Sequence, residues 1–157
     1  MEITLLVMGK STSRVFSEAV GDYLDRLRHY VPFSLRVLPD VRNVRNMSAS
    51  QQKEAEGRAF MAALQPSDFV VLLDERGKEY SSMEFAAYLQ GRMSAGLKRV
   101  VFVVGGPYGF SPEMYERAAH KISLSRMTLT HEMIRLLFVE QVYRAMTILR
   151  GESYHHE

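Results

Sequence analysis

The chain has 157 residues, of which 46% are hydrophobic and 24% are charged, and these proportions predict one globular domain over residues 1–157. The formal net charge of +2 does not indicate a strongly basic nucleic-acid binder. The absence of cysteine excludes disulfides, thiolate catalysis and cysteine-ligated zinc or iron–sulfur sites.

Strand-like and helical segments alternate from the first residues onward. Ile3–Val7 is predicted as a strand, and the hydroxyls of residues 11–13 are predicted to cap a helix that reaches Leu27. Ser34–Leu38 is a second predicted strand, and a polar, basic loop follows it over Pro39–Met47. The two strands and the helix between them fit the start of an alternating α/β fold.

The middle of the chain continues this alternation. The motifs SASQ at residues 48–51 and SSME at residues 81–84 are capping boxes, and each predicts a helix start. Pro66 ends the first of these helices. Between the two helices, Asp68–Leu73 is predicted as a strand that is closed by a polar turn with the sequence DERGK.

The most hydrophobic strand is VVFVV at residues 100–104, and it runs directly into Gly105 and Gly106. Continuous apolar residues of this kind are typical of a parallel strand buried on both faces. Glycines at its carboxyl end let another group approach the main chain, and ligands of open α/β sheets bind at that end. A tight turn without a ligand explains the glycines equally well, and Val104 breaks the dinucleotide fingerprint G-x-G-x-x-G.

The C-terminal third completes the fold prediction. Ser111 with Pro112 starts a helix, Lys121–Ser125 is a short fifth strand, and Thr130–Leu149 is a long last helix. Five strands alternating with helices predict an α/β fold with a mainly parallel sheet of five to six strands and helices on both faces.

The last helix carries apolar residues on two of its faces. A helix packed on one sheet needs a single apolar stripe, so a second apolar face predicts a homodimer. One face was assigned Ile134, Leu137, Phe138, Ala145 and Ile148, and the outer face Met133, Leu136, Val139, Val142, Tyr143 and Met146.

Three further stretches contain residues that could carry chemistry. Asp74 and Glu75 are adjacent carboxylates that fit an acid–base pair or a metal ligand set, although a solvated turn is the simpler interpretation. Residues 123–133 are rich in hydroxyls, which fit either a polar ligand or helix capping by Thr128 or Thr130, and His131 among them is a possible base or an ordinary surface histidine. Basic residues between Arg117 and Arg150 and in the loop at residues 36–45 fit a phosphate partner or ordinary solvated faces.

Four segments of the chain resemble one known family. The segments are LLDERGK, FVVGGPYGF, SLSRMTLTHEMIRLLFVEQVYRA and the ending RGESYH. They are similar to the bacterial pseudouridine N3-methyltransferases of large-subunit ribosomal RNA, which belong to the SPOUT class. The resemblance spans the whole chain and implies a C-terminal trefoil knot, a homodimer, S-adenosylmethionine as cofactor, and a pseudouridine of 23S RNA in the ribosome as substrate.

The resemblance also implies roles for particular residues. Tyr154 and His155 would act on the target base, and no metal is implied. This chain departs from the family pattern at Thr130, where proline is common, and at His156, where arginine or lysine is expected. The implied cofactor contacts are Leu73, Gly105, Gly106, Ser125, Arg126, Met127, Thr128, Leu129 and Thr130.

Two other functions remain compatible with the sequence. One is a SPOUT-type methyltransferase that acts on transfer RNA or on a ribose 2′-hydroxyl, and the other is a non-catalytic RNA-binding module. For each of these functions, and for the methyltransferase that the resemblance implies, we expect a cytoplasmic protein. The first apolar segment lacks the flanks of a signal peptide, and no apolar run approaches the roughly 20 residues of a membrane span.

Overall fold

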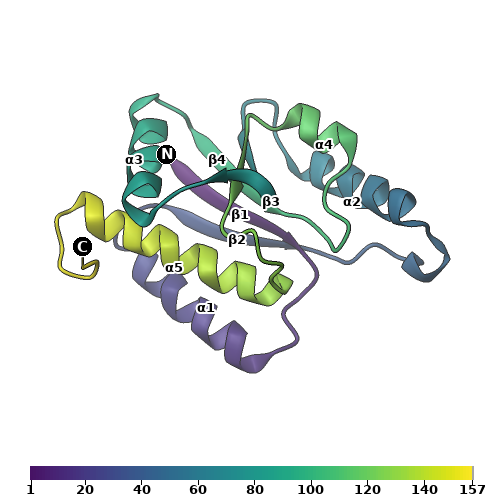
Figure 1. The fold of residues 1–157 in the computed structure, drawn as a ribbon, viewed down its shortest axis with the longest axis horizontal. Helices are drawn as coiled ribbons and strands as arrows, with labels where there is room; N and C mark the ends of the chain where they lie inside the picture. Colours follow the sequence, from purple (N-terminus) through teal and green to yellow (C-terminus); the bar gives the residue numbers. More distant parts are fainter. Residues whose placement is uncertain (157) are drawn as a thin grey trace.

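The computed structural model describes residues 1–156, in which five strands form one parallel sheet with the order β2-β1-β4-β3-β5 (Figure 1). This arrangement confirms the predicted α/β fold. The strands are β1 (Glu2–Met8), β2 (Phe33–Leu38), β3 (Phe69–Glu79), β4 (Arg99–Val104) and β5 (His120–Ser123). The helices are α1 (Arg14–Leu27), α2 (Ala49–Ala63), α3 (Ser82–Ser94), α4 (Pro112–Arg117) and α5 (His131–Leu149).

Helices cover both faces of the sheet, as predicted. The packing of α1, α3 and α5 buries one face, where Phe102 of β4 meets Phe138 of α5 with ring centroids 4.7 Å apart. The shorter α4 and the helix α2 cover the other face, where Phe60 packs near Phe110. Both predicted capping boxes are present, and Ser13, Ser111 and Thr130 cap the other three helices.

The polar turn predicted after Leu73 is wrong, because β3 continues to Glu79. The register shifts after Leu73, and the strand then resumes its pairing with Ile122 and Ser123 of β5. Gly77 permits this close approach, since a Cβ there would lie 2.6 Å from the backbone nitrogen of Ile122. Backbone pairing across a bulge therefore sustains a strand whose side chains are too polar to reveal it.

The assignment of an outer apolar face on α5 is also partly wrong. Val139 and Val142 are completely buried and Met146 is 5% exposed, because α1 and α3 flank α5 on both sides (Figure 1). These side chains belong to the core of the chain itself. Of the set assigned to the outer face, Met133 is the most exposed, at 39%.

The chain reverses direction after α5. Gly151 has a φ of +70°, and its amide donates to the carbonyl of Ile148, a helix ending that suits glycine. The residues that follow fold back onto α1 and α5, where the ring of Tyr154 packs edge-on against Tyr143 at 4.8 Å.

Within residues 1–156, no helix is long and apolar enough to span a membrane. The C-terminal trefoil knot stays a prediction.

Candidate active site

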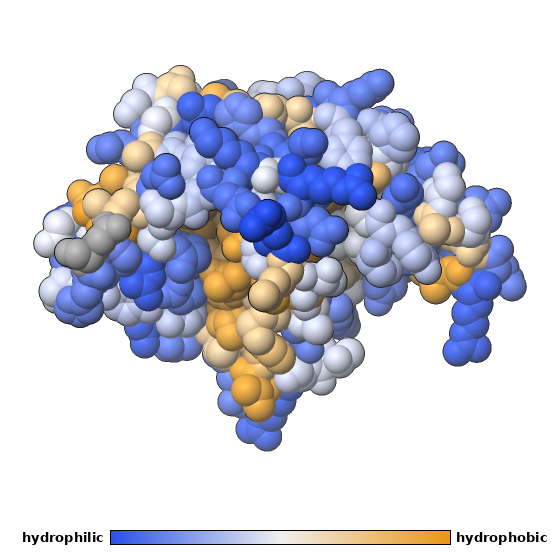
Figure 2. Space-filling view, in the orientation of Figure 1, coloured by the Kyte–Doolittle hydropathy of each residue, from blue (hydrophilic) through white to orange (hydrophobic). Residues whose placement is uncertain are grey.

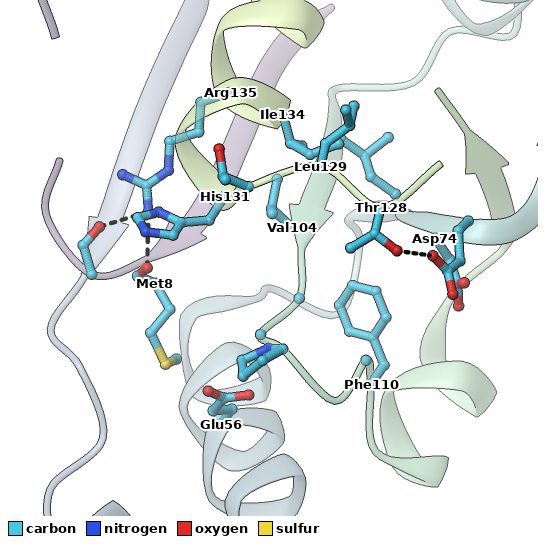
Figure 3. A pocket seen from close by; sticks show the side chains of 18 of the residues that line it. Met8, Glu56, Asp74, Val104, Phe110, Thr128, Leu129, His131, Ile134 and Arg135 are labelled. Atoms are coloured by element: carbon cyan, nitrogen blue, oxygen red, sulfur yellow. Dashed lines mark hydrogen bonds between the residues drawn. The ribbon is translucent and has the colours of Figure 1, made fainter. Parts of the chain in front are cut away.

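A cavity of about 690 Å³ opens at the carboxyl ends of the central strands (Figure 3). Its walls are the ends of β1, β3 and β4, the loop before α5, the first turns of α5, and α2. The neighbouring strands β1 and β4 lie where the chain connections diverge to opposite sides of the sheet. Ligands of open α/β sheets bind at such a switch point.

The cavity brings together eight of the nine predicted cofactor contacts. Arg126 is the exception, because its side chain is 82% exposed and pairs with Glu79 at 3.2 Å. The eight residues that line the cavity are Leu73, Gly105, Gly106, Ser125, Met127, Thr128, Leu129 and Thr130. Tyr154 and His155 are not among the lining residues.

The glycines after β4 are required by contacts within the chain as well as by the cavity. A Cβ on Gly105 would lie 3.0 Å from the ring of Phe110, and a Cβ on Gly106 would lie 2.5 Å from Oε1 of Glu56. Only the third glycine, Gly109, has a positive φ, of +83°. Gly105 and Gly106 therefore serve close packing, and Gly109 serves the turn.

Local hydrogen bonds shape the loop that precedes α5. The Ser125 hydroxyl accepts from the amide of Met127 at 2.9 Å, and the Thr130 hydroxyl accepts from the amide of Met133 at 3.2 Å. The second contact confirms helix capping by Thr130, whereas the first stabilises a turn within the loop. Thr128 donates to Glu75 across the cavity rim at 3.5 Å, which links the loop to the end of β3.

Asp74 and Glu75 do not form a metal site with their neighbours. The Tyr115 hydroxyl donates to Asp74 at 2.5 Å, and burial together with this carboxylate raises the pKa of Tyr115 to about 12. No group of histidine, aspartate and glutamate among residues 1–156 has the arrangement of a metal site. The pair of carboxylates therefore serves to hold β3 against α4 and the loop.

Two buried charged residues, Glu56 and Arg135, line the cavity, and the sequence analysis did not predict them. Glu56 is 8% exposed and accepts one hydrogen bond, from Gln52 at 3.3 Å. Burial, and secondarily the charge of Asp40, raises the pKa of Glu56. Arg135 is 3% exposed and donates to the carbonyls of Met8 and Gly9 at 2.9 and 2.7 Å, and burial lowers its pKa.

The helical spacing of these two residues was a usable signal. Glu56 lies four residues before Phe60, so it shares the inward face of its helix. Arg135 lies three residues before Phe138 on the face of α5 that contacts the sheet. A charged residue within an apolar face is either paired or functional.

Tyr154 and His155 lie beside the middle and the C-terminal half of α5, outside the cavity. The Tyr154 hydroxyl is 3.0 Å from Glu140 and 3.2 Å from the hydroxyl of Tyr23, and Nδ1 of His155 is 3.1 Å from Arg144. Burial and these two hydroxyl contacts raise the pKa of Tyr154. Glu140 lies five residues after Arg135, so roughly 8 Å along the helix axis separate its contact with Tyr154 from the cavity wall.

Comparison with known proteins identifies the family. A family model described as "Predicted SPOUT methyltransferase" matches residues 1–155, which is nearly the whole chain and includes every wall of the cavity. The chain is a SPOUT methyltransferase. The resemblance of its motifs to this family is thereby confirmed.

Several curated relatives match this SPOUT methyltransferase over its full length. A protein from Porphyromonas gingivalis is 60% identical over 157 residues, and one from Parabacteroides distasonis is 57% identical over the same length. A third, from Bacteroides thetaiotaomicron, is 52% identical. In each case 100% of both chains is covered, and each relative is named "Ribosomal RNA large subunit methyltransferase H".

A SPOUT methyltransferase needs a methyl donor, and the cavity fits a donor built on adenosine. Its volume lies within the range of small-molecule sites. Leu73, Leu129 and Ile134 supply apolar walls for a flat ring, and the strand ends supply main-chain donors and acceptors. Glu56 and Arg135 supply charges to the same lining.

Proposed function

We propose that the protein uses S-adenosylmethionine to methylate N3 of a pseudouridine in 23S ribosomal RNA, on the assembled ribosome. The full-length relatives, all named for methylation of large-subunit ribosomal RNA, support the substrate class. The cavity at the ends of β1, β3 and β4 is the observation that carries the proposal. The whole chain, residues 1–157, would act as one catalytic domain.

The protein contributes to this reaction mainly by positioning the reacting groups. The sulfonium of S-adenosylmethionine supplies an activated methyl group when the cofactor is bound. Leu73, Met127 and Leu129 would hold the adenine, while the main chain at Gly105 and Gly106 would lie against the adenosine. Holding the reacting atoms at about 3–3.5 Å contributes several kcal/mol to lowering the barrier.

Tyr154 and His155 fit a role in orienting the target base better than one in removing its proton. A tyrosine whose pKa is raised stays protonated at neutral pH, so its hydroxyl is not available to remove a proton. Nδ1 of His155 lies 3.1 Å from a guanidinium nitrogen of Arg144, which fixes the ring against α5.

We further propose a homodimer in which the tail of one protomer completes the cavity of its partner. Within one chain, α5 separates the tail from the cavity. Apolar side chains gather over the face on which α1 and α5 lie (Figure 2), and Val15 and Met133 are 76% and 39% exposed there. A second copy packed on this surface would cover these residues and bring a tail towards each cavity.

Ribosomal RNA would contact the loop beside the cavity. Arg42 and Arg45 are exposed in the segment that follows β2, while Asp40 of the same segment lines the cavity. Other basic residues are used within the chain, because Arg117 and Arg150 donate to backbone carbonyls and Arg144 pairs with Glu140. The modest net charge of +2 makes recognition depend on a structured RNA context rather than on charge alone.

Methyl transfer from labelled S-adenosylmethionine tests the proposal. The protein is incubated with ribosomes that lack the modification, with the free 23S RNA and with bulk transfer RNA, and the labelled nucleoside is identified by mass spectrometry. We expect label at N3 of one pseudouridine, and only with ribosomes. Label in transfer RNA or on a ribose would indicate a different SPOUT substrate, and cofactor binding without any transfer would favour a non-catalytic RNA-binding module.

A further inference from the structure

Two buried charges face the cavity from opposite sides of the sheet. Glu56 belongs to α2, which covers one face, and Arg135 belongs to α5, which covers the other. Both side chains line the same cavity, and Figure 3 shows them on its two walls. The lining also contains apolar residues, among them Leu73 and Leu129, and the further carboxylates of Asp40, Asp74 and Glu75.

Neither charge has a direct ion-pair partner in the described chain, although the carboxylates of Glu132 and Asp40 act on Arg135 from beyond ion-pair distance. No ion pair among residues 1–156 includes Glu56 or Arg135, although both are more than nine-tenths buried. Arg135 donates to two neutral carbonyls, and its Nε is buried without a hydrogen-bond partner among these residues. A buried charge without a partner is unfavourable, so both groups fit a ligand that carries opposite charges.

We propose that Glu56 and Arg135 recognise the amino-acid group of the methyl donor, with Glu56 accepting from its ammonium and Arg135 facing its carboxylate. This inference rests on the proposed function, because it requires an S-adenosyl ligand. An α-amino acid carries one cation and one anion on neighbouring atoms, which complements an acid and a base on facing walls. Adenosine ligands without this group leave both protein charges unsatisfied.

A purely structural role makes a different prediction for both residues. Arg135 holds the end of β1 through the carbonyls of Met8 and Gly9, and Glu56 packs beneath Gly106. If these contacts were their only role, replacing either residue would disturb the whole cavity. All adenosine ligands would then lose affinity to the same extent.

Calorimetric titration with two ligands separates these roles. S-adenosylhomocysteine carries the amino-acid group, and 5′-methylthioadenosine shares the adenosine and thioether but lacks it. We expect the native protein to bind the first ligand roughly tenfold to hundredfold more tightly, the usual effect of hydrogen bonds to charged groups. Glu56→Gln should remove most of this preference and leave the affinity for 5′-methylthioadenosine unchanged.

Matched variants and ligands test which protein charge binds the ammonium and which binds the carboxylate. Glu54→Gln alters an exposed carboxylate of the same helix and should change neither affinity. Arg135→Gln retains donors for the two carbonyls and removes the charge, and thermal melting confirms that it folds. The affinity for decarboxylated S-adenosylhomocysteine should be unchanged by Arg135→Gln and lowered by Glu56→Gln.

The outcomes distinguish this inference from the proposed function. If Glu56→Gln leaves the preference unchanged, or weakens both ligands equally, recognition of the amino-acid group by Glu56 is overturned while the function stands. If the native protein binds neither ligand, the proposed function fails, and this inference fails with it. The assignment is supported if Glu56→Gln loses the preference for S-adenosylhomocysteine and still binds both ligands, while Glu54→Gln keeps the preference.

Discussion

Just after β4, Gly106 has no side-chain carbon, and this leaves space for the carboxylate of Glu56. A methyl group on Gly106 would lie 2.5 and 2.7 Å from the two carboxylate oxygens. The obstructing atoms are the end of a flexible side chain, so Glu56 would move and the fold would persist. The first consequence of any larger residue at Gly106 is thus a displaced Glu56 at the cavity wall.

Gly106→Ala should lower the affinity for S-adenosylhomocysteine at least about tenfold, because the displaced carboxylate no longer meets the ligand. Calorimetry measures the affinity, and circular dichroism checks the fold. Gly91→Ala is the control, since nothing lies within 4 Å of its Cβ, and it should stabilise α3 by roughly 0.5–1 kcal/mol. Unchanged affinity in a folded Gly106→Ala protein would contradict the role of this wall.

Glu56→Gln should stabilise the cofactor-free protein above neutral pH. Burial raises the pKa of Glu56 in the folded state above its ordinary value of 4.5, so its protonated form favours folding. That favourable contribution is complete below pH 4.5 and is lost as the pH rises through the folded-state pKa. We expect a gain of roughly 0.5–2 kcal/mol for the variant at pH 8, shrinking towards pH 4. Urea unfolding across this range measures it, and an equal stability difference at all pH values would refute the assignment.

At the scale of elements, α5 connects two separate functional regions. Its first turns close the cavity with Ile134 and Arg135, and its middle and second half carry Glu140 and Arg144, which hold the tail. The rigid helix keeps these regions apart within one chain. The tail is therefore an ordered part of the α1–α5 surface rather than a frayed end.

Tyr154→Phe should lower the free energy of unfolding by about 1 kcal/mol. The variant loses the hydroxyl contacts with Glu140 and Tyr23, while the ring packing against Tyr143 remains. Urea unfolding measures the change. Tyr108→Phe, at a tyrosine that is 54% exposed, should have no effect, and equal stability of the two variants would show that the tail does not contribute to the fold.

At the scale of the whole molecule, the exposed apolar residues of α1 and α5 predict the dimer surface. Val15→Glu or Met133→Glu would bury an unpaired carboxylate at that interface and should weaken dimerisation at least about tenfold. Met83→Glu places the same charge in the first turn of α3, at a methionine that is 44% exposed, and should not alter the dimer. Analytical ultracentrifugation measures all three variants, and a native monomer at micromolar concentration would exclude the homodimer.

Mixed dimers test which tail completes which cavity. If the proposed roles hold, Gly106→Val blocks the cofactor site and His155→Ala removes the tail group, so each variant alone should be inactive on ribosomes. If tails act on the partner, mixing the variants restores about a quarter of the native rate, since half of the dimers are mixed and each has one intact site. If each tail acts on its own chain, the mixture stays inactive.

Much of the architecture was predictable because its signals are local. The capping hydroxyls of Ser13, Ser48, Ser81, Ser111 and Thr130 act within three residues, so they mark helix starts without knowledge of the rest of the chain. The apolar run before Gly105 likewise predicts a central strand. The extension of β3 to Glu79 was not predictable, because its pairing with β5 depends on residues more than 40 positions away.

The amino-acid order alone determined the alternation of strands and helices, the glycine-bearing end of β4, and the motifs that assign the SPOUT family. Only the tertiary structure brought Glu56 and Arg135 to opposite walls of one cavity, buried Val139 and Met146, and placed Tyr154 against Glu140 of α5. The physical reason is the range of the interactions. Capping and periodicity act within a few residues, whereas burial and charge pairing depend on segments that meet only when the sheet and its two helical layers have packed.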